Sequence, residues 1–531
     1  MADKLYAFGW NGAGQLGTGD VENKKVACPV EPLDDKRVAM VACGGPYTVL
    51  ATDTEEVWGF GANTRGQLGL GHALDQLMPR KLSPPAPLLS WKVEQISCGY
   101  AHTVFLTEDL SVYSCGANSW GQLGLGDTDD RNHPCLVERL SRVAVRQLDC
   151  GAAHTMVVCE GPRDKSAGGP LTPAKVRAML IDSDEPRSPD DAPDEQPDEP
   201  NYPEGSGVYG FGRNKEGQLG LGNRALQGRD LLSDQIQKEP REVTSLSQYL
   251  LADGGIELRC GGYHTAVLVQ NRTRLLTFGQ NCYGQLGLGD LHDRFAPDEV
   301  ELPVAKPGVK DPIEILACGG GHTMVVTESK QVLAFGRNNR GQLGVGDMDH
   351  HGLPSLVKGL CGRDIVQVEC GSKHTIVLTA ENELYAIGRN TEGQLGMGEV
   401  EQKPDPTPVK PDHWIPSHGH LSVGGFSAHN FFVPVPKMEE RRAKVRVLVG
   451  EQKRAMAMCL HRRLGNAAPA HMLSHDLIVY ICTFLPKRRT GILLAEGEDV
   501  ISKSPSVTAI LNAMDALGRP SRSQPAAAAS T

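Results

Sequence analysis

The chain has 531 residues, a net charge of −10 and 5% aromatic residues, and it is rich in turn formers, with 61 glycines and 35 prolines. This composition is typical of a turn-rich, mostly β protein, and the negative charge argues against a chain that wraps nucleic acid. We find no apolar run of about 18 residues, signal peptide or lipidation motif, so we expect no membrane span and place the 14 cysteines as free thiols in the cytoplasm or nucleus.

A turn motif recurs along most of the chain with a base period of about 52 residues. The shared turn reads G-x-N-x-x-G-Q-L-G-x-G. Its Gly-Gln-Leu-Gly part begins at Gly14, Gly66, Gly121, Gly217, Gly284, Gly341 and Gly393. Glycine permits positive φ, and asparagine can bond its own backbone, so we expect tight turns with the repeated leucine packed between repeats.

A second motif, C-G-x-x-[HY]-T, precedes most of these turns. It begins at Cys43, Cys98, Cys150, Cys260, Cys318 and Cys370. From His102 to Asn118, apolar runs are interrupted by Glu108-Asp109, which predicts a hairpin between two strands. Short strands between glycine turns at this period are typical of β-propeller blades, which bury their sheet faces by stacking on neighbours.

The two ends of the repeat region each hold half a repeat. Leu5 to Gly19 has a turn without the cysteine motif, and Ser422 to Val433 has a decayed cysteine motif without a turn. Together they make one blade. We therefore predict an all-β, seven-bladed β-propeller over residues 1–435, closed by N- and C-terminal strands and followed by a short α-helical C-terminal extension.

With these two motifs the chain resembles the regulator of chromosome condensation repeat family, whose seven-bladed propellers have blades of about this length. The resemblance covers the region from about Leu5 to Val435, apart from one insert. It implies the propeller fold. For function it implies several roles, because members serve as exchange factors for small GTPases, parts of ubiquitin ligases, photoreceptors or scaffolds.

Two of those roles fit this chain poorly. Exchange factors for Ran replace one turn with a projecting wedge, and chromatin-bound members add a basic N-terminal arm, whereas all seven turns here are intact and the repeats begin at Leu5. The photoreceptors need clustered tryptophans. Here the five tryptophans are spread over different repeats, at Trp10, Trp58, Trp91, Trp120 and Trp414.

The repeated cysteine and histidine of the second motif raise the question of metal binding. Each blade supplies one Cys-x₃-His pair, and blades radiate apart, so three or four ligands do not converge as a zinc site requires. We expect buried structural cysteines and hydrogen-bonded histidines. Phosphate-loop, zinc-protease and serine-hydrolase motifs are absent from the sequence, so we expect no catalytic residues, no cofactor and no metal.

An acidic residue follows the turn in five of the seven copies, with His72 and Asn223 in the others. These residues are Asp20, Asp127, Asp290, Asp347 and Glu399. Two interpretations remain open. They are turn residues favoured beside glycine, or they form a negative rim that attracts a basic partner.

Residues 162–206 interrupt one blade. Nine acidic residues, one arginine and four prolines lie between Asp182 and Glu199, which predicts a disordered acidic loop. Just before it, Leu171 to Ile181 can form a short amphipathic helix. The insert is either a linear binding motif or a solvated insertion without a role.

Beyond the propeller, residues 436–490 are basic and have helical periodicity, and residues 491–531 are predicted to be a low-complexity, disordered tail. A second helix from near Ser474 to Pro486 carries Leu477, Ile481 and Phe484 on one face. Its sequence resembles the first helix of F-box or related ligase-adaptor boxes, with Ser474 where that pattern has proline. The helices either dock on the propeller or present this face to a partner.

We therefore expect a non-enzymatic, protein-binding propeller scaffold, with a role as substrate adaptor of a ubiquitin ligase. The alternative is a guanine-nucleotide exchange factor or regulator of a Ran-like small GTPase. The expected partners are proteins, such as a small GTPase or a ubiquitin-ligase component. We expect no contact with membranes, no direct nucleic-acid binding and a monomeric propeller.

Overall fold

The computed structural model describes residues 4–84, 91–162, 205–222, 235–250, 256–303, 311–410, 419–425 and 427–434. The chain divides into a unit of Met1–Pro436 and a unit of Lys437–Thr531, and every described residue belongs to the first unit. The predictions made for most of the acidic insert and for the C-terminal helices therefore lie outside the described residues. Within the described ranges, no helix is long and apolar enough to cross a membrane.

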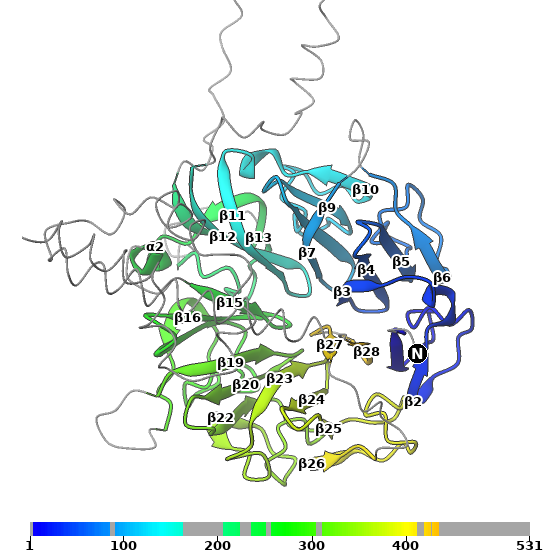
Figure 1. The fold of residues 1–531 in the computed structure, drawn as a ribbon. Helices are drawn as coiled ribbons and strands as arrows, with labels where there is room; N and C mark the ends of the chain where they lie inside the picture. The colour runs from blue at the N-terminus through cyan, green and yellow to red at the C-terminus, as the bar shows by residue number, and fades with distance from the viewer. Residues whose placement is uncertain are drawn as a thin grey trace, which may run out of the picture. The chain divides into compact units, whose positions relative to one another are not determined.

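The described residues form seven four-stranded sheets, which Figure 1 shows arranged around a common axis. Six of these sheets are built from four consecutive strands in chain order. This arrangement confirms the predicted all-β, seven-bladed propeller.

The strands fall into four classes by their place in the sheet. The first strands are β3 (Val38–Cys43), β7 (Val93–Cys98), β11 (Val143–Cys150), β15 (Glu257–Cys260), β19 (Ile313–Cys318), β23 (Ile365–Cys370) and β27 (Gly419–Val423). The second strands are β4 (Tyr47–Thr52), β8 (His102–Thr107), β12 (His154–Pro162), β16 (His264–Val269), β20 (His322–Thr327), β24 (His374–Thr379) and β28 (His429–Pro434). The third strands are β5 (Val57–Gly61), β9 (Val112–Gly116), β13 (Ser206–Arg213), β17 (Arg274–Gly279), β21 (Val332–Gly336), β25 (Leu384–Gly388) and β1 (Tyr6–Gly9). The fourth strands are β6 (Gln76–Lys81), β10 (Arg131–Leu136), β14 (Ile236–Glu242), β18 (Arg294–Glu299), β22 (His351–Leu356), β26 (Lys403–Pro408) and β2 (Lys24–Pro29).

The two sequence motifs mark the ends of these strands. Six first strands end at the motif cysteine, six second strands begin at a histidine, and third strands such as β9 end at the first glycine of the turn motif, with β13 running one residue further. The predicted hairpin at Glu108-Asp109 is confirmed, because it joins β8 to β9.

One sheet combines strands from distant parts of the sequence, in the order β2-β1-β28-β27. Strand β1 pairs antiparallel with β28, with Tyr6 opposite Phe432 and Gly9 opposite His429. Strands near both ends of the propeller region thus share one ladder of backbone hydrogen bonds.

The fourth strands form the outer edges of the sheets. Six of them contain an interior proline, at Pro79, Pro134, Pro240, Pro297, Pro354 and Pro406. Proline cannot donate a ladder hydrogen bond, so it is tolerated at an edge and discourages pairing with another chain.

The apolar core lies between neighbouring sheets. The turn leucines, such as Leu68, are fully buried in all seven copies. Leu68 follows β5 but packs in a cluster with Phe105 and Cys115 of the next sheet. The predicted packing of the repeated leucine between blades is confirmed.

Short helices occupy connections between sheets: the 3₁₀ turns η1 (Glu31–Leu33) and η2 (Glu138–Leu140), and helix α2 (Thr244–Leu250). The sequence analysis did not predict these three helices. Leu246 of α2 is fully buried in the core cluster that also contains Val243 and Leu258, so the helix covers the space between two sheets.

Candidate functional site

Neighbouring strands in each sheet run antiparallel, so the first-to-second and third-to-fourth connections leave the sheet at the same end. These connections carry the C-G-x-x-H-T loop and the G-x-N-x-x-G-Q-L-G turn, and we call this end of the propeller the motif-loop face. The hairpins between second and third strands lie at the opposite face. Residues 163–204 are inserted in one of those hairpins, between β12 and β13.

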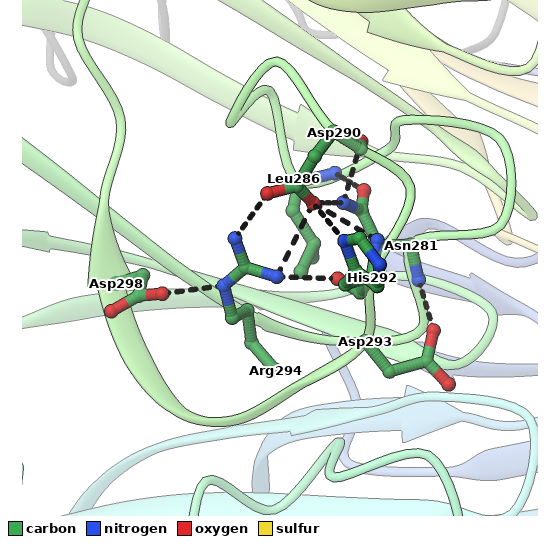
Figure 2. A network of polar contacts seen from close by, with 7 residues as sticks. All are labelled: Asn281, Leu286, Asp290, His292, Asp293, Arg294 and Asp298. Atoms are coloured by element: carbon green, nitrogen blue, oxygen red, sulfur yellow. Dashed lines mark hydrogen bonds and ion pairs between the residues drawn. The ribbon is translucent and has the colours of Figure 1, made fainter.

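The five acidic residues of the predicted rim lie in the turns of five different sheets, each within its own network, as Figure 2 shows for Asp290. Asn281 accepts a hydrogen bond from the Leu286 amide at 3.0 Å and donates to the Asp290 carbonyl at 2.9 Å. In all seven turns the leucine amide donates to the asparagine side chain in the same way. The motif asparagine and the acidic residue after the turn are therefore both held by hydrogen bonds within the turn.

Each of these carboxylates also contacts a basic side chain four residues later. Arg294 binds Asp290 at 2.6 Å and holds the pKa of that carboxyl at about 2, helped by the His292 amide. The equivalent pairs are Asp20–Lys24, Asp127–Arg131, Asp347–His351 and Glu399–Lys403. The rim thus presents local pairs, and its role as a negative surface stays a prediction. Of the other two positions, His72 accepts from Asn63 through its carbonyl, and Asn223 lies outside the described residues.

The motif histidines form a closed belt of hydrogen bonds between neighbouring blades, and we call this the histidine belt. Its seven contacts are Tyr47–Thr103, His102–Thr155, His154–Thr265, His264–Thr323, His322–Thr375, His374–Asn430 and His429–Thr48. Their lengths run from 2.7 to 3.3 Å. The motif glycine makes room for the ring, because a Cβ on Gly99 would lie 2.1 Å from His102.

The direction of these bonds follows from the threonine. Thr375 donates its one hydroxyl hydrogen to the Gln342 carbonyl at 2.9 Å, so it accepts from His322 Nε2. Nδ1 of His322 is buried and has no hydrogen-bond partner among the described residues. Burial lowers the pKa of His322 to about 3, which keeps the ring neutral.

The motif cysteines are buried thiols within the same inter-blade contacts. Cys150 Sγ donates to the Ser97 carbonyl of the neighbouring sheet at 3.6 Å, and burial raises the pKa of Cys98 to about 12. Among the described residues, no three His, Cys, Asp or Glu side chains lie close enough to hold a metal ion. The motif cysteines are buried, and the motif histidines are buried and hydrogen-bonded, as the sequence predicts.

The first strands line a central channel of about 620 Å³, and the charged side chains in its lining include three next to motif cysteines that the sequence analysis missed. Asp149, Arg259 and Glu369 each directly precede a motif cysteine, so strand alternation turns them toward the channel. Burial raises the pKa of Glu369 to about 7. A charged residue before the motif cysteine is the signal that would have found them.

The motif-loop face carries a hollow of about 380 Å³, which we call the loop hollow. Its lining includes Trp10, Pro46, Tyr100, Lys373 and Arg389 from four sheets. Tyr100 is 56% exposed, although it is a large aromatic residue.

The same face carries arginines stacked on aromatic rings. Arg213 lies 4.6 Å from the Trp120 ring and 5.0 Å from the Tyr263 ring. Arg337 lies 4.7 Å from the Tyr283 ring. Cation–aromatic contacts of this kind hold long side chains in defined positions on a surface.

Most of these residues share one feature of sequence. Trp10, Arg213, Arg337 and Arg389 fill the variable position of G-x-N, while Tyr100, Tyr263 and Lys373 fill variable positions of C-G-x-x-H-T. The sequence analysis examined the constant letters of both motifs and missed the variable ones. The tail residues Leu477, Ile481 and Phe484 lie outside the described residues.

The described tryptophans contact different neighbours in different sheets. Trp91 packs on Phe105 at 4.9 Å, and Trp120 lies under Arg213. Lys36 lies 5.8 Å from the Trp58 ring. Trp414 lies outside the described residues.

A family model described as "Regulator of chromosome condensation (RCC1) repeat" matches residues 3–51, 55–106, 111–158, 206–268, 274–326 and 330–378. A second model of the same description matches residues 93–122, 313–342 and 365–394. The first model covers more than half of the chain and falls on the blades rather than on the insert.

Among curated relatives, the chain is 31% identical to the Ultraviolet-B receptor UVR8 of Arabidopsis thaliana, over 75% of each chain. It is 29% identical to the Probable E3 ubiquitin-protein ligase HERC4 of Homo sapiens, covering 67% of this chain and 32% of the ligase. This chain therefore spans about a third of the length of that relative.

Among solved structures, human WBSCR16 matches with a TM-score of 0.61 at 22% identity, covering 82% of this chain and all of that one. Yeast RCC1 (Prp20) in complex with Kap60 matches with a TM-score of 0.61 at 18% identity, covering 83% of this chain and 91% of that one. At these identities the likeness concerns the fold alone.

Proposed function

Because this chain belongs to the regulator of chromosome condensation repeat family, we propose that it is a non-enzymatic propeller scaffold that binds protein partners through its motif-loop face. The observation that carries this proposal is the loop hollow, where exposed Tyr100 lies beside Trp10 and the cations Lys373 and Arg389.

The division of labour within the motifs supports this proposal. The constant asparagine, glutamine, leucine and histidine are buried and bonded within the fold. Some of the variable positions line the loop hollow on the motif-loop face, and there they carry Trp10, Tyr100 and Arg389. These three residue types dominate the energetic centres of protein interfaces.

A pull-down with the full chain tests the proposal. Tyr100→Ala removes the exposed ring, and the matched control is Glu381→Ala, an exposed residue in a hairpin of the opposite face. We expect wild type and Glu381→Ala to retain the same partner and Tyr100→Ala to lose it. A partner retained equally by all three proteins would place the binding surface elsewhere.

We propose in addition that the C-terminal helices act as an adaptor for a ubiquitin ligase. The resemblance to an F-box helix supports this, and a relative named as a probable ubiquitin-protein ligase is consistent with it. Changing Ile481 and Phe484 to Asp places charges on an apolar contact worth about 1.5–3 kcal/mol per buried side chain. An adaptor face loses its ligase partner while the melting temperature stays unchanged. A lower melting temperature, with no ligase component captured by wild type, would make the helices a structural cap.

Regulation of a small GTPase is the second candidate. A dog relative named X-linked retinitis pigmentosa GTPase regulator, 29% identical over 57% of this chain and 29% of its own length, supports it. All seven turns keep the same asparagine bond, so among the described residues the G-x-N-x-x-G-Q-L-G turn is intact in every blade. We therefore expect little release of labelled GDP from a Ran-like GTPase. Acceleration by several orders of magnitude would replace the scaffold by an exchange factor.

The remaining organisation is part of the same proposal. We propose that pairing of β1 with β28 closes the propeller, and that the chain also contains an acidic insert at 162–206, a basic helical extension at 436–490 and a tail at 491–531. A cytoplasmic or nuclear location rests on the sequence alone.

A further inference from the structure

Four basic side chains come together on the motif-loop face of two adjacent sheets. Arg337 and Arg340 lie in the β21–β22 turn, Lys373 in the β23–β24 loop and Arg389 at the start of the β25–β26 turn. The Arg389 amide donates to the Lys373 carbonyl at 2.9 Å, which holds these two residues side by side. Burial and the charges of the three arginines lower the pKa of Lys373. We call these four residues the basic cluster.

The rim carboxylates each pair with a basic side chain, whereas most side chains of the basic cluster do not pair with a carboxylate among the described residues. Only Arg389 has a carboxylate partner, Glu392 at 3.0 Å, among the described residues. Arg337 donates instead to the Asn339 side-chain oxygen at 3.0 Å and stacks on Tyr283. Arg337, Arg340 and Lys373 therefore have no carboxylate partner in the described part of a chain whose net charge is −10. An anionic ligand would relieve their mutual repulsion.

The cluster is continuous with the loop hollow, because Lys373 and Arg389 line it together with Trp10 and exposed Tyr100. One ligand can therefore contact both the positive charges and the aromatic rings. Glu392 also lines the hollow, and Asp347 and Glu399 follow the two turns concerned. These carboxylates would repel the continuous phosphate backbone of a nucleic acid. A peptide can place its separate carboxylates beside the basic side chains and an apolar side chain between them.

We propose that the basic cluster and the loop hollow together bind a short acidic peptide segment of a partner protein. Carboxylates of the segment pair with Lys373, Arg337 and Arg340, and an apolar side chain enters the hollow against Tyr100. This inference rests on the proposed function as a protein-binding propeller, and it names the chemistry of the partner.

The test measures binding of a fluorescein-labelled peptide of alternating glutamate and phenylalanine to the full chain by fluorescence anisotropy. The variant Arg340→Glu/Lys373→Glu reverses two charges, and Lys215→Glu is the matched control, an exposed lysine in a turn of another sheet on the same face. We expect the double variant to weaken binding roughly tenfold or more, and the control to bind as wild type does. Equal melting temperatures check that all three proteins fold.

Binding should also weaken as salt is added, and the same peptide with glutamine in place of glutamate should not bind. No binding of the acidic peptide by wild type, or equal binding by the double variant, overturns the inference. Equal or tighter binding of oligothymidylate, lost in the double variant, assigns the cluster to nucleic acid and overturns it as well. If a partner is still captured through Tyr100 while the acidic peptide fails, the proposed function stands without this inference.

Discussion

The six buried histidines of the belt carry out one task that depends on their protonation state. Each ring donates from Nε2 to a threonine or asparagine of the next sheet, and its buried Nδ1 has no partner in the part of the chain that the structure describes. A second proton, on Nδ1, would place a positive charge in this buried position. Burial therefore lowers the pKa of each histidine to about 3 or 4, below the ordinary value of 6.5.

This depression makes stability depend on pH in a defined direction. Between the folded and unfolded pKa values the unfolded chain binds more protons, so the free energy of unfolding falls as pH decreases below about 6.5. The variant His322→Gln keeps a donor but removes one titrating group. We expect its destabilisation relative to wild type to be smaller by about 2 kcal/mol at pH 4.5 than at pH 7, measured by urea unfolding.

The matched control is His133→Gln, which makes the same substitution at an exposed histidine outside the belt. Glu369 acts in the opposite direction, because its raised pKa makes stability fall as pH increases from about 4.5 to 7. Comparing variants at each pH removes this contribution, since Glu369 is present in all of them. If the free energy of unfolding had the same pH dependence in wild type and in His322→Gln, the belt histidines would not be held neutral.

At the scale of single elements, the turn motif is a self-contained unit. The Asn281 side chain closes it by accepting from the Leu286 amide and donating to the carbonyl and the carboxylate of Asp290, and Asp293 accepts from the Asn281 backbone amide at 2.7 Å (Figure 2). Gly284 has φ +77°, and a Cβ there would lie 2.4 Å from Gly352 of the next sheet. Glycine is needed here both for the backbone angle and for the approach of the neighbouring blade.

We expect Asn281→Ala to lower the free energy of unfolding by about 1–3 kcal/mol, because the buried Leu286 amide loses its acceptor. The matched control is Cys282→Ala, an exposed neighbour in the same turn. Thermal and urea unfolding of both variants measure the difference. Equal stability of the two variants would mean that water or backbone shifts replace the asparagine.

At the scale of the whole molecule, closing a ring removes two exposed sheet edges. Strand β1 pairs with β28, and the belt contact between His429 and Thr48 lies at the same junction. The proposed closure therefore depends on a few residues near the start of the chain.

Deleting Met1 to Gly12 removes β1 and exposes the edge of β28. We expect a melting temperature lower by many degrees and self-association through the open edge, detected by calorimetry and analytical ultracentrifugation. Deleting residues 1–3 alone leaves β1 intact and serves as the control. If the variant that lacks Met1 to Gly12 melted at the same temperature as the full-length chain, pairing of β1 with β28 would not be what closes the propeller.

The sequence by itself determined the number of blades, the turns and the buried leucines and cysteines of this protein. Each depends on residues close together in one repeat, such as Asn281 and Leu286, so a motif and its spacing are enough to predict them. The basic partner of each rim acid, four residues later, was also readable in the sequence, although we did not use it.

Only the tertiary structure decided which charged residues lie together. Arg340 and Lys373 belong to different repeats and share a surface because neighbouring blades meet at one face. Asp149 and Glu369 share the central channel although more than two hundred residues separate them. A closed ring brings equivalent positions of all repeats around one axis, so contacts between variable positions depend on how the blades pack. Local spacing carries no record of that packing.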